Sequence, residues 1–547
     1  MQSTMMDVPL TVTALMRYGT SAFADHEVVT AGSSGTRRRS YGVTGARAAR
    51  LANALRSLGI DADQRVATLM WNNAEHLEAY LAIPSMGAVL HTLNLRLDPK
   101  VIGYIATHAG DDAVIVDATL LPLLAQVLPH APTIRHVLVT RSEDGTDSLA
   151  EPGLAGDGRR VHSYEELLAA QPDSFDWPDL DERSAAAMCY TSGTTGQPKG
   201  VVYSHRSTYL HSMGVCQGNV FAMSERDRVL PVVPMFHANA WGLPYAAVLS
   251  GADLIMPDRF LQPEPLVRLI EAERPTLAGA VPTIWNMLLA HVRAHGADLS
   301  SLRLVPCGGA AVPHALQEAY EKELGVRIVQ AWGMTETSPL GSVAHPPAGM
   351  PEPESWRYRD TAGRIICSME ARLVGPEGTA LPHDGKAVGE VEVRGPWVTG
   401  AYYKDDDPGK FRDGWLRTGD VGTIDRLGFV TLTDRAKDVI KSGGEWISSM
   451  ELENALMAHP EVAEAAVIGV PDQKWGERPL AAVVLAAGAS VTAAQLRAFL
   501  AGRFPRWQLP ERWSFITEVP KTSVGKFAKT RIREAYAEGD YEVIEAR

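Results

Sequence analysis

Segment 190–200 has the composition of a loop that binds phosphate. It reads Tyr-Thr-Ser-Gly-Thr-Thr-Gly-Gln-Pro-Lys-Gly and follows an apolar run, so we expect it to leave the end of a strand. Its small residues expose backbone N–H groups and Lys199 adds a positive charge, which suits an anionic triphosphate. An ordinary turn would explain the glycines but not the Pro-Lys-Gly ending. The segment is not a Walker A loop, because no Gly-Lys-Ser/Thr follows at the required spacing.

Further motifs that could do chemistry follow in order along the chain. They are 234–237 (Pro-Met-Phe-His), 308–311 (Gly-Gly-Ala-Ala), 330–336 (Gln-Ala-Trp-Gly-Met-Thr-Glu), 418–420 (Thr-Gly-Asp), 434–438 (Asp-Arg-Ala-Lys-Asp), 441–447 (Lys-Ser-Gly-Gly-Glu-Trp-Ile) and 520–526 (Pro-Lys-Thr-Ser-Val-Gly-Lys). Trp332, Thr335 and Glu336 combine a flat aromatic, a hydroxyl and a carboxylate. One carboxylate together with phosphate oxygens is a normal environment for Mg²⁺. The small residues at 308–311 would let the backbone approach a ligand closely.

Together these motifs resemble those of the adenylate-forming superfamily, which comprises acyl-CoA synthetases, firefly-type luciferases and peptide-synthetase adenylation domains. The resemblance implies ATP, Mg²⁺ and coenzyme A as ligands. The implied nucleotide contacts are Thr191, Ser192, Gly193, Thr194, Thr195, Lys199, Gly309, Ala310, Ala311, Gln330, Ala331, Trp332, Gly333, Thr335, Asp420 and Arg435.

The resemblance also assigns roles. Trp332 would stack on adenine, Thr335 would contact the α-phosphate, and Glu336 would hold Mg²⁺ with Thr194. A carboxylate has enough acceptor sites for both ribose hydroxyls, which is the role implied for Asp420, with Arg435 as a second ribose contact. The implied catalytic residues are Lys526, Thr335, Glu336 and His237; Lys437 would be the hinge about which a small domain rotates between two half-reactions. The implied coenzyme A loop contains Lys441, Ser442, Gly443, Gly444, Glu445 and Trp446.

The sequence after His237 indicates which acid is activated. Segment 237–242 (His-Ala-Asn-Ala-Trp-Gly) resembles the fatty-acid and methylthio-acid CoA ligases, in which the Trp241 position gates an acyl tunnel. Amino-acid adenylation domains usually carry an aspartate here for the ammonium group, and none occurs before Asp253; no carrier-protein segment follows either. The expected acyl pocket comprises His237, Trp241, Val281, Thr283 and Gly333. We expect a fatty acyl-CoA synthetase for a medium- or long-chain acid.

Other functions stay open. The chain could be a short-chain, methylthio- or aryl-acid CoA ligase, or an acyl-AMP ligase that loads an acyl carrier protein. A degenerate relative that only senses acyl-adenylate or acyl-CoA is a further alternative, although every catalytic position carries the family residue. Nothing specific supports a luciferase-type oxidation.

The elements that must position these motifs alternate between strands and helices. Segments 113–118 and 136–140 read as buried strands, 284–295 as a helix, and 302–307 as a strand leading through glycines into a helix at Pro313. Segment 141–178 reads as a surface loop with one short helix. We expect an α/β protein: residues 1–435 form mostly parallel α/β subdomains plus a β-barrel-like subdomain, and 436–547 form a small mobile α+β domain.

Composition excludes some partners. The net charge of the 547 residues is −13, which disfavours nucleic acid, and we expect Arg37–Arg39 to lie on a solvated strand or turn. No apolar run approaches the roughly 20 residues of a membrane helix, and no secretory signal begins the sequence. Cys189 and Cys307 are expected to be buried free thiols. These features predict a cytoplasmic protein, and the resemblance implies a homodimer.

Overall fold

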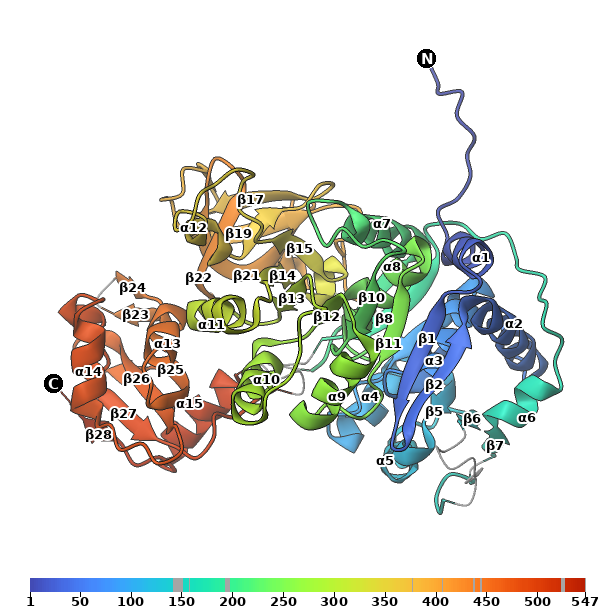
Figure 1. Cartoon of the computed structure of the whole chain (residues 1–547), viewed down its shortest axis with the longest axis horizontal. Coiled ribbons are helices and arrows are strands. Elements are labelled where there is room, and N and C mark those ends of the chain that lie inside the picture. Colours follow the sequence, from blue (N-terminus) through green and yellow to red (C-terminus); the bar gives the residue numbers. More distant parts are fainter. Residues whose placement is uncertain are drawn as a thin grey trace.

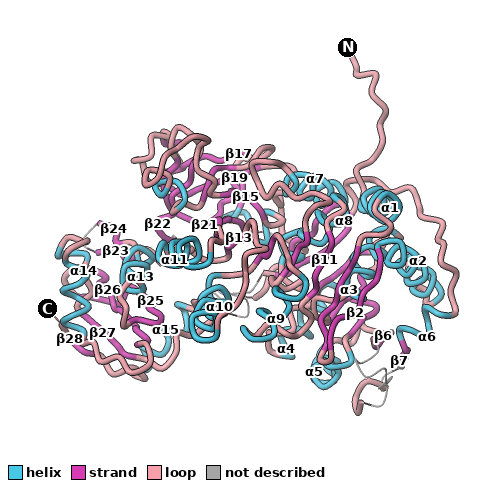
Figure 2. Tube along the Cα trace, in the orientation of Figure 1, coloured by secondary structure: helices cyan, strands magenta, loops and turns pink. Residues whose placement is uncertain are grey.

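The computed structural model describes residues 1–140, 151–156, 158–191, 197–375, 377–405, 407–435, 438–442, 445–522 and 527–546. It consists of a large N-terminal body and a small C-terminal body, shown in red in Figure 1. Figure 2 shows that both bodies mix helices with strands. The predicted α/β fold class is confirmed.

Two sheets form most of the large body. The first runs in the order β12 (Leu277–Gly279), β10 (Arg228–Pro231), β11 (Asp253–Met256), β1 (Glu27–Gly32) and β2 (Gly35–Ser40). The second runs in the order β7 (Arg160–Ser163), β6 (His136–Val139), β5 (Asp111–Val116), β3 (Arg65–Leu69), β4 (Val89–Thr92), β8 (Ala185–Tyr190) and β9 (Gly200–Ser204). The pairs β1–β2 and β8–β9 are antiparallel and the other pairs are parallel.

Helices cover both faces of these sheets. They are α1 (Val12–Ala22), α2 (Tyr41–Ser57), α3 (Ala74–Ser85), α4 (Pro99–Ala109), α5 (Leu121–Val127), α6 (Tyr164–Ala169), α7 (His205–Cys216), α8 (Leu243–Ser250), α9 (Pro263–Glu273), α10 (Pro282–His295) and α11 (His314–Leu324). Successive strand residues enter different cores: Val28 packs with helices α1–α3 and α8, which also pack on the second sheet, whereas Val29 packs with α9–α11. Since side chains alternate across a strand, both faces of these parallel strands are apolar.

A third, mostly antiparallel sheet completes the large body. Its order is β13 (Val305–Gly308), β14 (Ile328–Gly333), β15 (Leu340–Val343), β16 (Gly363–Ile365), β22 (Phe429–Arg435), β21 (Trp415–Ile424), β19 (Gly389–Arg394), β17 (Glu370–Val374) and β18 (Ala380–Leu381), with β20 (Phe411–Arg412) beside β21 and helix α12 (Trp356–Arg359) between β15 and β16 in the chain. Strand β14 therefore joins the parallel part to the antiparallel part.

The small body is built on a separate sheet. Its strands are β23 (Ile440–Ser442), β24 (Glu445–Ile447), β25 (Val462–Asp472), β26 (Gly476–Leu485), β27 (Arg512–Phe515) and β28 (Ile544–Glu545), and its helices are α13 (Ser449–Met457), α14 (Ala493–Ala501) and α15 (Lys529–Glu538). Ser448 caps α13 by accepting a hydrogen bond from the Glu451 N–H, as its sequence pattern predicts. The proposed boundary at 435/436 falls between β22 and β23.

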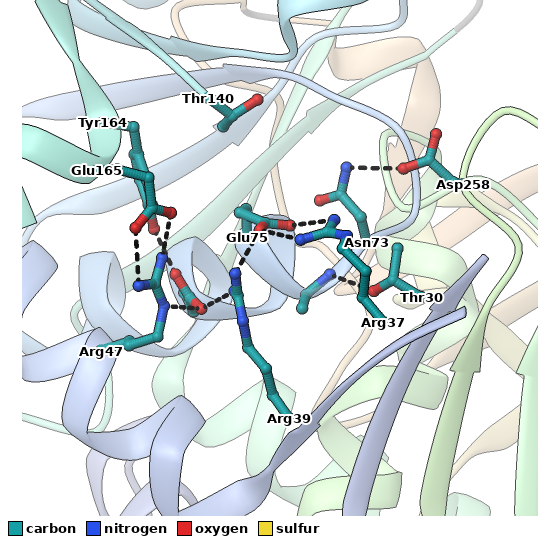
Figure 3. A network of polar contacts seen from close by, with 12 residues as sticks. Thr30, Arg37, Arg39, Arg47, Asn73, Glu75, Thr140, Tyr164, Glu165 and Asp258 are labelled. Atoms are coloured by element: carbon teal, nitrogen blue, oxygen red, sulfur yellow. Dashed lines mark hydrogen bonds and ion pairs between the residues drawn. The ribbon is translucent and has the colours of Figure 1, made fainter. Parts of the chain in front are cut away.

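Two sequence expectations need correction. Segment 141–178 contains the expected short helix, α6, but its described part also contains the strand β7, whose four residues are too few to give a clear pattern. The basic run Arg37–Arg39 does lie on a strand, β2, but its side chains are not simply solvated. Arg37 pairs with Glu75 at 2.9 Å, and Arg39 pairs with Glu78 at 2.5 Å, as part of the network in Figure 3.

Two further expectations concern cysteines and membranes. Cys189 and Cys307 are buried free thiols, as predicted. Among the described residues, no helix is both long enough and apolar enough to cross a membrane.

Candidate active site

The ends of the proposed phosphate loop are held by the β8–β9 hairpin. The Thr191 N–H donates to the Lys199 carbonyl at 2.9 Å, and the Lys199 N–H donates to Thr191 Oγ1 at 3.1 Å. Ser192, Gly193, Thr194 and Thr195 lie outside the described residues. The structure therefore defines where the loop leaves and rejoins the sheet.

The Lys199 side chain faces an acidic segment in the connection between strands β19 and β20 of the third sheet. Its Nζ lies 3.0 Å from Asp405 Oδ2 and 2.8 Å from Asp407 Oδ2, and 4.9 Å from the centre of the Tyr402 ring. The hydrogen bond to Asp407 raises the pKa of the Lys199 ammonium. Sequence reasoning missed both aspartates, although the acidic run at 405–407 was a visible signal.

Glu336 lies in a short turn after β14. Its Oε1 accepts a hydrogen bond from the Tyr402 hydroxyl at 2.6 Å, and its carbonyl accepts one from the Thr399 N–H at 2.8 Å. The Thr335 carbonyl accepts a hydrogen bond from the Tyr203 hydroxyl at 2.7 Å. Glu336 is only 6% exposed. A single fixed carboxylate fits a Mg²⁺ ion whose other ligands are phosphate oxygens and water.

Trp332 and Asp420 are in direct contact. The Trp332 indole Nε1–H donates to Asp420 Oδ2 at 2.8 Å, and Arg435 Nε lies 3.2 Å from Asp420 Oδ1. Strands β21 and β22 produce this arrangement, because their register places Asp420 opposite Arg435. Attraction to Asp420 raises the pKa of Arg435. The three residues expected around adenosine thus form one connected group.

The small-residue turn follows β13. A Cβ on Gly308 would lie 2.4 Å from the Ala331 carbonyl oxygen, and Gly309 has a φ of +84°, so both positions favour glycine. Gln330 holds this turn: its Oε1 accepts from the Val312 N–H at 2.7 Å, and its Nε2 donates to the Thr361 carbonyl at 2.8 Å. Its amide is therefore engaged with backbone and positions the turn that contains Ala310 and Ala311.

Trp241 lies in an unusual turn beside these strand ends. Residues Ala238–Gly242 all have left-handed φ values, from 41° at Ala238 to 72° at Gly242. A Cβ on either Gly279 or Gly308 would lie 3.7 Å from the Trp241 ring, so the indole crosses the ends of β12 and β13. Left-handed geometry costs about 1–2 kcal/mol for each non-glycine residue, and the packing of the indole helps to hold it.

The remaining expected pocket residues lie on segments that adjoin these strand ends. His237 precedes the left-handed turn, and Val281 and Thr283 lie at the start of α10. Gly333 ends β14, where a Cβ would come 1.8 Å from the Pro339 carbonyl oxygen. The β12, β13 and β14 ends therefore bring the expected acyl and nucleotide residues into one region.

The expected small-domain residues are described only in part. Lys437, Gly443, Gly444 and Lys526 lie outside the described residues. Lys441 and Ser442 lie on β23, and Glu445 and Trp446 lie on β24. Ser442 is buried, and its Oγ accepts a hydrogen bond from Arg478 at 3.1 Å.

Hydrogen bonds between β22 and the start of α13 cross the expected hinge. Asp434, on β22, accepts a hydrogen bond from the backbone N–H of Ser449 at 2.7 Å, at the start of α13. The structure therefore holds the two bodies together by a carboxylate at a helix N-terminus, which is a favourable arrangement.

Comparison with known families identifies both bodies. The family described as AMP-binding enzyme matches residues 18–403, and the family described as AMP-binding enzyme C-terminal domain matches residues 451–526. The first match alone covers more than half of the chain.

Individual proteins match over almost their whole length. A 3-methylmercaptopropionyl-CoA ligase of Ruegeria pomeroyi is 43% identical, with 97% of this chain and 98% of the relative covered. A long-chain-fatty-acid–CoA ligase of Thermus thermophilus is 44% identical, with 98% and 97% covered. The crystal structure of the anthranilate CoA ligase AuaEII with anthranoyl-AMP superposes with a TM-score of 0.85 at 25% identity, covering 98% of this chain and 99% of the ligase.

Proposed function

The chain belongs to the AMP-binding enzyme family and is an acid–thiol ligase, and we propose that it is an AMP-forming fatty acyl-CoA synthetase. In the first half-reaction, the carboxylate of a medium- or long-chain fatty acid attacks the α-phosphate of ATP and pyrophosphate leaves. In the second, the thiol of coenzyme A attacks the acyl carbonyl and AMP leaves.

The described residues support the first half-reaction. We assign Lys199 to phosphate oxygens, and Asp420 with Arg435 to ribose hydroxyls, beside the Trp332 indole. Mg²⁺ held by Glu336 would neutralise charge on the phosphates. Lys526 carries the proposed catalytic role, in which its ammonium offsets negative charge as the carboxylate attacks.

Rotation of the small domain about Lys437 would then switch the active site from the first half-reaction to the second. In the second pose, segment 441–446 would face the site and line the passage for pantetheine. A few residues that absorb a large change in φ and ψ are the usual basis of such a hinge.

The position of Trp241 is the observation that favours an aliphatic acid as the substrate. Its indole lies against the ends of β12 and β13, beside the small-residue turn, and would offer the apolar surface that an alkyl chain requires. Asp253, the next acidic residue along the chain, is unavailable to an ammonium group because it lies 2.7 Å from Arg228 and 3.1 Å from His26. An amino acid is therefore a poor substrate for this pocket.

A methylthio-substituted short acid is the second candidate. The similarity to the 3-methylmercaptopropionyl-CoA ligase is as high as that to the long-chain ligase, at 43% against 44% identity. A thioether is nearly as apolar as a methylene group, so the same apolar walls would accept it. An acyl carrier protein as acceptor, a homodimer and a cytoplasmic location stay further proposals.

A panel of acids tests the proposal. Saturated acids from C3 to C18, 3-methylthiopropionate, cinnamate and benzoate are each assayed with ATP, Mg²⁺ and coenzyme A, measuring AMP and acyl-CoA. We expect the highest kcat/KM on a medium- or long-chain acid. Fastest turnover of 3-methylthiopropionate would establish the second candidate, and fastest turnover of an aryl acid would reject both. Replacing coenzyme A by phosphopantetheinylated carrier proteins tests the alternative acceptor.

Lys526→Ala is the matched inactive variant for this panel. It should lose several orders of magnitude in pyrophosphate exchange but still transfer the acyl group from a presynthesised adenylate. Lys521→Ala is the control, because Lys521 lies in the same motif and pairs with Glu464 at 2.6 Å. Exchange by Lys526→Ala within tenfold of the wild type would reject the assignment.

A further inference from the structure

Tyr190, the last residue of β8, is bound by a histidine outside the family motifs. Its hydroxyl lies 2.7 Å from His108 Nδ1. Burial raises the pKa of Tyr190, so the phenol stays protonated and can act as the hydrogen-bond donor. His108 lies in the last turn of α4, where its ring stacks on Tyr104 with centroids 5.6 Å apart.

The Tyr190 ring is enclosed on its other sides as well. The His91 ring centroid lies 5.2 Å away, and His91 Nδ1 is bonded to the fully buried Asp111 at 2.8 Å. A Cβ on Gly200 would lie 3.0 Å from Tyr190 Cζ, and the Gly200 carbonyl accepts a hydrogen bond from the Tyr403 N–H at 2.8 Å. Tyr190 is thus fixed from α4, β4, β9 and the segment that precedes Asp405.

We propose that His108 is a positioning residue for the phosphate loop and acts through Tyr190. This inference rests on the proposed function, because it assumes that segment 191–199 binds the phosphates of ATP. The next residue, Thr191, makes two hydrogen bonds with the Lys199 backbone: the Thr191 N–H donates to the Lys199 carbonyl, and Thr191 Oγ1 accepts from the Lys199 N–H. A shift of the Tyr190 ring would therefore move both ends of the loop, and small displacements of binding groups weaken productive binding.

The protonation state of His108 sets the direction of its hydrogen bond with Tyr190. Burial and the nearby Lys404 ammonium lower the pKa of His108, while Asp405 acts in the opposite direction. Tyr104 and Tyr403 also face the imidazole; Asp111, His91 and Arg65 face the Tyr190 side. The lowered pKa keeps the imidazole uncharged near neutral pH, and a neutral imidazole can accept the phenol hydrogen bond at Nδ1. Once His108 is protonated, Nδ1–H donates to the Tyr190 hydroxyl oxygen instead, so the contact is kept with its direction reversed.

Tyr190→Phe tests the proposal, because it removes only the hydroxyl. KM for ATP and kcat are measured by pyrophosphate exchange from pH 5.5 to 8.5, and a fluorescent ATP analogue is titrated in parallel. At pH 7.5 we expect KM to rise about three- to tenfold, the size of one ordinary hydrogen bond, with kcat within about twofold. The ratio of the Tyr190→Phe KM to the wild-type KM should hold from pH 5.5 to 8.5, because the contact is kept in both protonation states of His108.

His108→Asn provides the rescue. The amide oxygen of asparagine can take the place of Nδ1 as an acceptor but does not titrate, so this variant should keep a low KM at both pH 7.5 and pH 5.5. Tyr104→Phe is the control, because it alters a ring stacked on His108 outside this hydrogen bond, and should behave as the wild type does.

Two results would overturn the proposal. One is a KM of Tyr190→Phe within twofold of the wild type across the whole pH range. The other is a fall in kcat at unchanged KM, which would indicate a general structural role. If the wild type catalyses no exchange with any acid, the proposed function fails, and the titration with the ATP analogue still decides whether Tyr190 and His108 control nucleotide binding.

Discussion

Arg39, on strand β2, and Lys199, directly before strand β9, are both cations held by two carboxylates, yet their surroundings differ. The Arg39 side chain is 18% exposed, and its partner Glu78 is completely buried. The Lys199 side chain is 33% exposed, and its partners Asp405 and Asp407 are 35% and 36% exposed. Both clusters pair charges at similar distances, so burial is what separates them.

This difference indicates which cation can change partners. Removing one member of a buried pair leaves an uncompensated charge, so the Arg39 cluster is fixed by the fold. A partly exposed ion pair contributes little to the free energy of folding. Replacing a carboxylate by a phosphate oxygen as the partner of Lys199 therefore costs little free energy. We therefore assign Arg39 to stability and Lys199 to ligand binding.

Among the variants that test this comparison, Lys199→Ala should cause the largest change, which is a loss of activity with ATP. We expect kcat/KM for ATP in pyrophosphate exchange to fall about 10²-fold, because a positive charge directed at the phosphates is lost. The apparent melting temperature should stay within about 1–2 °C, since the pairs removed are half-exposed. Lys322→Ala, which breaks an exposed pair with Glu318, is the control and should change neither quantity. A rate of pyrophosphate exchange within threefold of the wild type would show that Lys199 serves stability, as Arg39 does, rather than ligand binding.

Glu78→Ala should produce the opposite result. Glu78 lies 2.5 Å from Arg39 and 2.6 Å from Arg47, and it accepts a hydrogen bond from the Tyr164 hydroxyl at 2.7 Å. Its removal should lower the free energy of unfolding by about 3–5 kcal/mol, measured by urea denaturation. The folded variant should keep the wild-type KM for ATP. A loss below 1 kcal/mol, or a changed KM at full folding, would contradict the assignment.

The local sequence predicts the helices and strands of the fold better than it predicts these two ion-pair clusters. Helix α10 follows from the apolar spacing of 284–295, and the buried runs β5 and β6 follow from their branched residues. The contact of Lys199 with Asp405 spans more than two hundred positions and two sheets. No local pattern encodes such a contact, because it depends on how the subdomains pack.

The left-handed turn at Trp241 escaped prediction for a different reason. Ala238, Asn239 and Ala240 all have positive φ values, which their side chains disfavour, and only Gly242 suits the conformation. Propensity therefore predicts an ordinary turn or a helix start. Tertiary packing of the indole on β12 and β13 outweighs this local preference.

Asp117→Asn should change how stability depends on pH. Burial, followed by repulsion from Asp258, raises the pKa of Asp117 to about 8. Between about pH 4 and pH 8 the folded chain holds this proton and the unfolded chain does not, so stability falls as the pH rises.

The expected result is a flatter profile. Asparagine is uncharged; its Oδ1 can still accept from the Trp71 N–H, as Asp117 Oδ2 does, while its amide N–H would donate to the Thr140 hydroxyl, which in the wild type donates to Asp117 Oδ1. Asp117→Asn should therefore gain stability relative to the wild type as the pH rises from 5 to 8, measured by urea denaturation. Asp173→Asn, at a side chain that is 67% exposed, is the control. A difference between Asp117→Asn and wild type that does not change with pH would show that Asp117 is ionised in the folded chain.

Arg268→Gln should give the smallest effect and sets the baseline for the others. Arg268 pairs with Glu264 at 2.6 Å, closer than Lys199 lies to either aspartate, but both side chains are 67% exposed. An exposed pair at this helical spacing contributes about 0.3–0.5 kcal/mol, because water and salt screen it. The free energy of unfolding should fall by no more than that amount, and the loss should vanish in 0.5 M NaCl, while KM for ATP stays unchanged. A loss comparable with that of Glu78→Ala would show that distance, rather than burial, decides which ion pairs stabilise this protein.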